Sequence, residues 1–244
     1  MKNKTELGLA VASIFAVLCT GANAAPVALV NQGYESGLAG WNFTNGTGSV
    51  TATGETSIVA GGNEWVVTPY ETQMAQLNSS GTSVSGLDAF FGLSAGTINA
   101  AVFGDAISGA GIKQSFTGHS GDTVTQFWDF VARDGVESGR FSNDSAFVVV
   151  NGQVTVLASI QEGGIAVGNY GHSDWQSFNY TLPADGTYTL GFGVVNARDR
   201  VAPAALFLDD QLVSSVPEPE TYAMLVAGLG LLGFMAKRKN LSST

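Results

Sequence analysis

The fold class of this chain is decided by the stretch AFVVVNGQVTVL, which spans Ala146 to Leu157. Its two flanks are rich in β-branched and aromatic residues, which favour strands. Between them lies Asn151-Gly152, the residue pair that best fits a two-residue turn with positive φ angles. The stretch therefore predicts a β-hairpin.

The same alternation with a period of two continues downstream. In the run 187–194, the face opposite the large residues carries only small side chains. These either admit close approach by another element or leave a flat solvent face. Leu206 and Leu208 begin the same pattern again in a last strand. The alternating large residues are Phe178, Tyr180 and Leu182, then Tyr188, Leu190, Phe192 and Val194, and the small ones are Thr187, Thr189, Gly191 and Gly193.

No alternation of strands with helices and no long amphipathic helix occurs between residues 25 and 215. Regular short strands of this kind are typical of a sandwich. We therefore expect an all-β, two-sheet antiparallel β-sandwich of the jelly-roll type over residues 25–215. A signal helix precedes it and a short transmembrane helix follows it in this prediction.

The composition supports a folded, acidic, surface-type domain. The chain has 244 residues, of which 45% are hydrophobic and only 12% charged, with 32 glycines and a formal charge of −10. Between residues 25 and 215 there are five basic and 17 acidic residues, a charge of −12. A nucleic-acid partner is excluded because no basic surface can form to meet the phosphates.

Residues 1–24 have the three parts of a secretory signal peptide. Lys2 and Lys4 precede an apolar run over residues 7–18, and Ala22-Asn23-Ala24 forms the small-residue cleavage site. A spanning helix is the alternative, but the run is shorter than the roughly 20 residues that a bilayer requires. Cleavage after Ala24 removes Cys19, the only cysteine, so the mature protein has no thiol and no disulfide.

Residues 216–244 form a tail of different composition. Pro217-Glu218-Pro219 favours extended backbone, residues 222–236 are apolar, and residues 237–239 read Lys-Arg-Lys. As a helix the apolar run is about 22 Å long, short of a hydrocarbon core of roughly 30 Å, so it spans only where the bilayer thins. The basic cluster keeps the C-terminus cytoplasmic and the domain outside the inner membrane.

This tail resembles a PEP-CTERM sorting signal. The resemblance rests on Pro217-Glu218-Pro219, on the Gly/Leu-rich apolar run and on the terminal basic residues; only the short extension 240–244 departs from it. It implies an exported protein of a Gram-negative bacterium that makes exopolysaccharide. The tail anchors the protein transiently in the inner membrane, and an exosortase-type membrane peptidase cleaves it there. The mature protein then reaches the cell surface or the extracellular matrix.

The domain itself resembles jelly-roll, galactose-binding-like modules, though in pattern and not by a signature motif. The similar segments are 31–35 with Gly40-Trp41, 114–116 with 121–123, and 174–176 with 186–188 and 206–210. Many such modules bind carbohydrate and many hold a structural calcium ion. The resemblance implies that Glu35 and Asp209 are calcium ligands, with backbone carbonyls completing the six to eight oxygens that calcium needs. Two unrelated exposed acids are the alternative.

Other polar and aromatic residues give further candidates. Trp65, Tyr70, Tyr170 and Trp175 lie near turn residues, and exposed aromatic faces stack on the apolar C–H surfaces of sugars; core packing is the alternative for each. Trp41 and Trp128 are expected in the core. A second acidic group is either a cation site, a ligand-binding rim or a set of Arg–carboxylate pairs that hold loops. That group comprises Asp129, Asp134, Asn143, Asp144 and Asp199, with Arg133, Arg140, Arg198 and Arg200 nearby in sequence.

Catalytic motifs are weak. Gly92-Leu93-Ser94-Ala95-Gly96 has the spacing of a nucleophile elbow, but that motif needs a strand–turn–helix context, which is not expected here. His119 and His172 both lie in stretches that read as polar turns. We therefore expect a non-catalytic binding or structural protein of the cell envelope or exopolysaccharide. The alternative is a polysaccharide hydrolase or lyase, which a pocket with two shifted carboxylates would favour.

Overall fold

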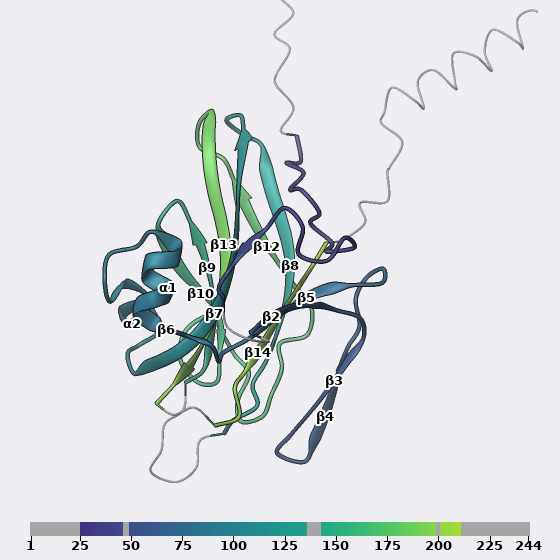
Figure 1. The fold of residues 1–244 in the computed structure, drawn as a ribbon, viewed down its shortest axis with the longest axis vertical. Coiled ribbons are helices and arrows are strands. Elements are labelled where there is room, and N and C mark those ends of the chain that lie inside the picture. Colours follow the sequence, from purple (N-terminus) through teal and green to yellow (C-terminus); the bar gives the residue numbers. More distant parts are fainter. Residues whose placement is uncertain (1–24, 46–48, 136–142, 199–200, 211–244) are drawn as a thin grey trace, which may run out of the picture.

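The computed structural model describes residues 25–45, 49–135, 143–198 and 201–210. They form two packed β-sheets, with a pair of short helices beside one sheet and a separate hairpin beside the other (Figure 1). The all-β class predicted from the alternating pattern is confirmed, and the two helices add a minor element to it.

The larger sheet has seven strands. Its path runs β1-β7-β13-β9-β10-β11, with β6 pairing beside β7. Strand β11 runs parallel to β10, whereas the other described strand pairs are antiparallel. The strands are β1 (Asn42–Phe43), β6 (Thr82–Ser83), β7 (Ala106–Gly118), β9 (Ser145–Val150), β10 (Gln153–Ser159), β11 (Ile165–Ala166) and β13 (Gly186–Ala197).

The smaller sheet has five strands in the order β12-β8-β14-β5-β2, all antiparallel. A third, two-stranded sheet is the hairpin β3–β4. The strands are β2 (Val50–Thr53), β3 (Thr56–Ala60), β4 (Asn63–Val67), β5 (Met74–Asn78), β8 (Thr123–Val131), β12 (Gln176–Thr181) and β14 (Ala205–Asp209).

The main core lies between the two large sheets. Ile112 and Phe192 of the seven-stranded sheet pack in one cluster with Phe130 and Leu206 of the five-stranded sheet, and all four are fully buried. Trp41 and Trp128 belong to the same cluster, as predicted. Because each sheet turns one apolar face to the other, the arrangement is the expected sandwich.

The predicted hairpin is present as β9 and β10. Val150 pairs with Gln153, and the turn residues Asn151 and Gly152 have φ angles of 46° and 83°. Positive φ at both central turn residues is what the Asn-Gly pair supplies. The downstream alternation likewise corresponds to β12, β13 and β14.

The small-residue face of β13 receives a helix. Helices α1 (Val84–Phe91) and α2 (Thr97–Ala101) lie on the side of the seven-stranded sheet away from β3–β4 (Figure 1). A Cβ atom at Gly191 would come within 2.5 Å of the Phe91 ring, and one at Gly111 of β7 within 2.7 Å of it. Of the two predicted alternatives for this face, close approach by another element is therefore correct.

The elbow-like motif 92–96 joins these two helices. Gly92 ends α1 in the left-handed conformation, and the Asp88 carboxylate accepts hydrogen bonds from Gly96 N and Ile98 N. The segment connects helix to helix and contains no strand-to-helix elbow. Its glycines and Asp88 shape a helix connection, so the motif carries no nucleophile.

The predicted signal peptide with its cleavage residues Ala22 and Ala24 lies outside the described residues. So does the tail, with Pro217-Glu218-Pro219 and the predicted helix 222–236. Within the part of the chain that the structure describes, no helix is long and apolar enough to cross a membrane.

Candidate functional site

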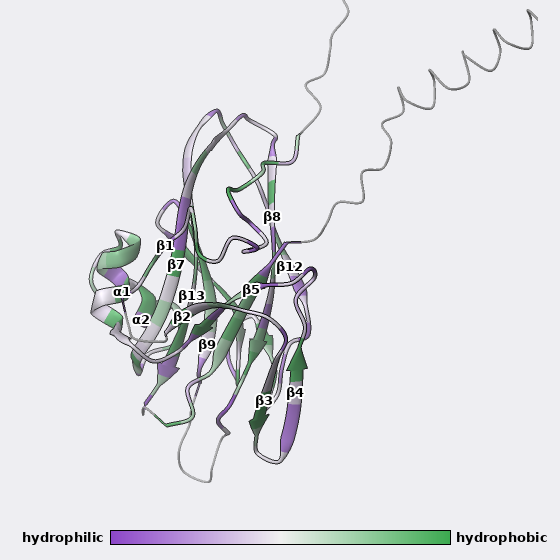
Figure 2. Cartoon of the chain, turned by 45° about the vertical axis from the view of Figure 1, so that its right-hand side comes forward, coloured by the Kyte–Doolittle hydropathy of each residue, from purple (hydrophilic) through white to green (hydrophobic). Residues whose placement is uncertain are grey.

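The hairpin β3–β4 covers part of the outer face of the five-stranded sheet. Ile58 and Val67 of the hairpin are buried in one cluster with Met74, Val131 and Phe207 of the sheet. Figure 2 shows β3 mainly in green and β4 changing from purple to green along its length, so the apolar part of β4 is its second half. The hairpin therefore fixes which parts of the outer face stay accessible.

Two carboxylates hold the segment that follows β4 against the sheet. Asp209 Oδ2 accepts a 2.6 Å hydrogen bond from Tyr70 N. Glu35 accepts hydrogen bonds from Thr72 N at 2.9 Å and Gln73 N at 2.8 Å, and a further one from the Thr72 hydroxyl. These contacts place the side chain of Tyr70 beside the last strand, although it is 54% exposed.

A cavity of about 340 Å³ opens at this place, and we name it the aromatic cavity. Trp175 donates from Nε1 to the Thr68 carbonyl at 3.2 Å, which fixes its indole at the cavity. Asp209 lies opposite Phe127 in the β14–β8 ladder, so their side chains share the outer face. The lining residues are Thr68, Pro69, Tyr70, Phe127, Trp175, Asp209 and Asp210.

A second cavity of about 510 Å³ adjoins the first along β8 and β12. It shares Phe127 and Asp210 with the aromatic cavity and continues past Thr125 and Asn179. Thr125 Oγ1 donates to Asn179 Oδ1 at 2.7 Å across the two strands. Together the two cavities form one depression with an aromatic, acidic end and a neutral polar end.

Negative charge accumulates at the aromatic end. Burial raises the pKa of Asp209 to about 6, and the charges of Asp210 and Glu35 act in the same direction. The pKa of Asp210 is also raised, by burial first and then by Glu35. Burial acts to raise the pKa of Glu35 too, but its hydrogen bonds from Thr72 and Gln73 outweigh this and lower it. All three carboxylates therefore lie close enough to interact electrostatically.

The predicted calcium ligands Glu35 and Asp209 thus lie at the same end of the domain. Their oxygens already accept hydrogen bonds from segment 70–73, and Asp209 Oδ1 also accepts one from Asp210 N. Among the described residues, no three Asp, Glu, His or Cys side chains are grouped so that they could hold a metal ion. A calcium ion here would need backbone carbonyls for most of its ligands.

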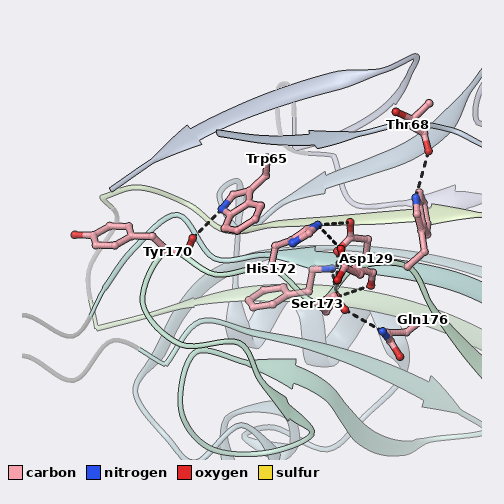
Figure 3. Close-up of polar contacts among 10 residues, drawn as sticks. Trp65, Thr68, Asp129, Tyr170, His172, Ser173 and Gln176 are labelled. Atoms are coloured by element: carbon pink, nitrogen blue, oxygen red, sulfur yellow. Dashed lines mark hydrogen bonds and ion pairs between the residues drawn. The ribbon is translucent and has the colours of Figure 1, made fainter. Parts of the chain in front are cut away.

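Trp65 and Tyr170 lie in a separate network. The Trp65 indole stacks on the His172 imidazole with ring centroids 4.5 Å apart, and its Nε1 donates to the Tyr170 carbonyl at 2.8 Å. His172 Nε2 lies 3.6 Å from Asp129 Oδ2 and 3.2 Å from Asp174 Oδ1 (Figure 3). The network fastens β4 to the five-stranded sheet.

Asp129 is the buried member of this network. Its side chain is 2% exposed and accepts a hydrogen bond from Ser173 Oγ at 3.1 Å. Burial raises its pKa, although the neighbouring His172 acts in the opposite direction. Asp129 lines neither of these two cavities, so it does not share a pocket with Asp209.

The four predicted aromatic ligands therefore divide into two pairs. Tyr70 and Trp175 meet at the aromatic cavity, whereas Trp65 and Tyr170 pack and hydrogen-bond in the network. Phe127 is a cavity residue that the sequence analysis did not identify. It lies two positions from Thr125 on β8 and next to the core residue Trp128, and this alternation is the signal that places its side chain on the outer face. His172, predicted to be a turn residue, is half-buried against Trp65.

The second acidic group does not form one site. Strands β8 and β9 belong to different sheets, so residues 128–134 and 143–145 are not brought together by strand pairing. Asp144 is buried and accepts from Ala197 N at 2.9 Å, and Asn143 accepts from Gln161 N and Glu162 N. Arg198 pairs with Asp105 at 2.9 Å, an Arg–carboxylate pair with a partner that was not predicted. Arg140, Asp199 and Arg200 lie outside the described residues.

Comparison with known families gives one match. Residues 215–239 match the PEP-CTERM protein-sorting motif, which confirms the resemblance found in the tail. The motif implies export and sorting by an exosortase. No curated protein matches the chain.

Several solved structures resemble the chain at low identity. A CBM61 module in complex with β-1,4-galactotriose is 13% identical, with 75% of this chain and 93% of that chain covered and a TM-score of 0.38. The CBM22-1–CBM22-2 tandem domain of Xyn10C from Paenibacillus barcinonensis is 17% identical, with 82% and 48% covered and a TM-score of 0.33. A cyclase from Fischerella sp. TAU is 14% identical, with 76% and 96% covered and a TM-score of 0.38.

Proposed function

We propose that this protein is an exported, non-catalytic carbohydrate-binding module that holds polysaccharide at the cell surface or in the extracellular matrix. The observation that carries the proposal is the aromatic cavity, where Tyr70 and Trp175 meet beside Asp209 and Asp210. Aromatic faces stack on the apolar C–H faces of sugar rings. Carboxylate oxygens accept hydrogen bonds from sugar hydroxyls. The cavity therefore combines the two contacts that a sugar needs.

The sorting motif supports the cellular setting of this proposal. In the proposed route, the signal peptide directs export, helix 222–236 holds the protein in the inner membrane, and an exosortase cleaves near Pro217-Glu218-Pro219. The domain is then released toward exopolysaccharide. Its net charge of −12 between residues 25 and 215 keeps it soluble and repels acidic polymers at long range.

A glycan array with the purified protein tests the binding proposal. The wild type is expected to bind at least one class of polysaccharide. Tyr70→Ala and Trp175→Ala should each weaken that binding by about tenfold or more, since a partly buried aromatic contact of about 1.4 kcal/mol corresponds to tenfold. Phe43→Ala is the matched control, because Phe43 is exposed on β1 of the other sheet. An array without any bound glycan would refute the proposal.

A structural calcium ion at Glu35 and Asp209 is part of the proposal. A ligand that binds only the folded state raises the melting temperature. We expect the melting temperature to rise with millimolar calcium and to fall again with chelator. Glu35→Gln should abolish this shift, while Glu64→Gln, an exposed carboxylate of β4, should keep it. An unchanged melting temperature would remove calcium from the account.

Polysaccharide cleavage is the second candidate, and one observation favours it. Two carboxylates with raised pKa values, Asp209 and Asp210, line the same cavity. Paired carboxylates of this kind serve as acid and base in glycoside hydrolysis. New reducing ends after incubation with a bound polysaccharide, lost in Asp209→Asn, would establish cleavage and would replace the non-catalytic proposal.

A further inference from the structure

The aromatic cavity brings together aromatic rings and negative charge. Three aromatic residues line it, together with two carboxylates, and none of its lining residues in the described part of the chain is Lys, Arg or His. Organic ammonium ions are recognised by this chemistry, because the negative faces of aromatic rings and nearby carboxylates both attract a cation. Neutral sugars use the rings and the carboxylate oxygens as hydrogen-bond acceptors, but only a cationic sugar is also attracted by the net negative charge.

That charge has no internal counter-ion among the described residues. Neither Asp209 nor Asp210 pairs with Lys, Arg or His in the described part of the chain, where the ion pairs involve Asp105, Asp122, Asp129 and Asp174. The donors to Asp209 are the backbone amides of Tyr70 and Asp210, which carry no net charge. Glu35 adds further negative charge at the same end.

We propose that the aromatic cavity selects an ammonium-bearing sugar, so that the ligand is a polysaccharide with free amino groups. This inference rests on the carbohydrate-binding part of the proposed function and names its ligand class; it does not rest on calcium, which would compete with the ammonium group for the same carboxylates. The sugar ring stacks on Trp175 or Tyr70, and its protonated amine lies toward Asp210. The neutral polar end of the depression, past Thr125 and Asn179, receives the next sugar of the chain. Uronic-acid polymers are excluded as ligands, because their carboxylates are repelled by the carboxylates of Asp209 and Asp210.

Two hexasaccharides with the same sugar backbone, one cationic and one neutral, test the inference. The β-1,4-linked hexamers of glucosamine and of N-acetylglucosamine have the same length and linkage, but only the first carries ammonium groups. Isothermal titration calorimetry is run with the full chain, at a pH where the amine is protonated, and with chelator so that no divalent cation occupies the carboxylates. We expect the amino hexamer to bind about tenfold tighter or more, with the difference shrinking at high salt.

The variant Asp210→Asn tests whether the preference for the amino hexamer arises at Asp210. The substitution removes one charge and preserves the shape of the side chain. Affinity for the amino hexamer is expected to fall by about tenfold, and affinity for the N-acetyl hexamer should stay within about twofold. Glu64→Gln changes the net charge by the same amount on the exposed side of β4 and should leave both affinities unchanged.

The remaining outcomes distinguish failure of this inference from failure of the proposed function. Equal binding of the two hexamers by the wild type overturns the inference, while loss of neutral binding in Trp175→Ala still supports the proposed function. A preference that weakens equally in Asp210→Asn and in Glu64→Gln reflects overall charge and also overturns it, as does a preference that is unchanged in Asp210→Asn. If neither hexamer nor any arrayed glycan binds, the inference and the proposed function both fail. Should Asp210→Asn unfold, the wild type decides the question. Glucosamine and glucose are each used as competitors for binding of the amino hexamer, and equal competition by the two overturns the inference.

Discussion

Asp129 is a carboxylate that the fold buries beside His172, and the cost of that burial depends on pH. Burial raises its pKa, so the folded protein holds the proton more tightly than the unfolded chain does. The stabilising contribution is thus complete below the unfolded pKa of about 3.9 and is lost as pH rises through the folded pKa. Asp129→Asn does not titrate but still accepts the Ser173 hydrogen bond.

The free energy of unfolding of Asp129→Asn, relative to wild type, is therefore expected to increase as pH rises from about 4 to neutrality. Urea unfolding across this range measures it, with Glu64→Gln as the control for net charge. A relative stability that falls with rising pH would contradict the assignment, because it would mean that the charged carboxylate, held by His172, is the form that folding favours.

At the same scale, the sequence predicts which types of residue form the site better than it predicts which individual residues belong to it. Tyr70 and Trp175, which lie near turn residues in the sequence, both line the aromatic cavity. The same signal fails for Trp65, because the hairpin that carries it folds onto the sheet and stacks its ring on His172. That contact joins residues more than 100 positions apart, and no local pattern encodes it. Alternation along β8 places Phe127 on the outer face, but which part of that face stays accessible depends on the hairpin β3–β4, which no local pattern encodes.

At the scale of the elements, the packing of helix α1 depends on glycines in the seven-stranded sheet, because a glycine has no side chain that would occupy the contact. Phe91 packs where Gly191 and Gly111 have no Cβ atoms. Gly191→Ala should lower the free energy of unfolding by about 1–3 kcal/mol, because it overpacks this contact. Gly186→Ala is the control on the same strand, with its nearest neighbour 3.9 Å away, and should change stability by no more than about 0.5 kcal/mol. Chemical denaturation compares the two; equal effects would refute the packing argument.

Whether an element can be predicted depends on how close together in the sequence the residues lie that determine it. The hairpin β9–β10 and strands β12 to β14 were predicted because turn residues and alternation lie within a few positions of one another. Helices α1 and α2 were not predicted, since segments of eight and five residues carry too little helical periodicity. The pairing of β8 with β14 instead of β9 is set by the sandwich topology, which short-range patterns do not specify.

At the scale of the whole molecule, we expect the tail and the domain to act independently. Residues 215–239 match the sorting motif, and the described domain ends before them. Replacement of Pro217-Glu218-Pro219 by alanines should therefore leave folding and binding intact but keep the protein in the membrane fraction. Cell fractionation measures this, with Ser214→Ala, outside the motif, as the control. Unaltered processing and release would show that these residues do not direct sorting.

The central claim is that the aromatic cavity on the outer face of the five-stranded sheet binds carbohydrate. Trp175 is its most direct probe, and Trp65 is its matched control, because it is a tryptophan of the same face that lines neither cavity. The decisive measurement is the affinity of wild type, Trp175→Ala and Trp65→Phe for the glycan that binds best on the array. The account predicts a loss of about tenfold or more for Trp175→Ala and an affinity within about twofold of wild type for Trp65→Phe. Equal affinity of Trp175→Ala and wild type would contradict it.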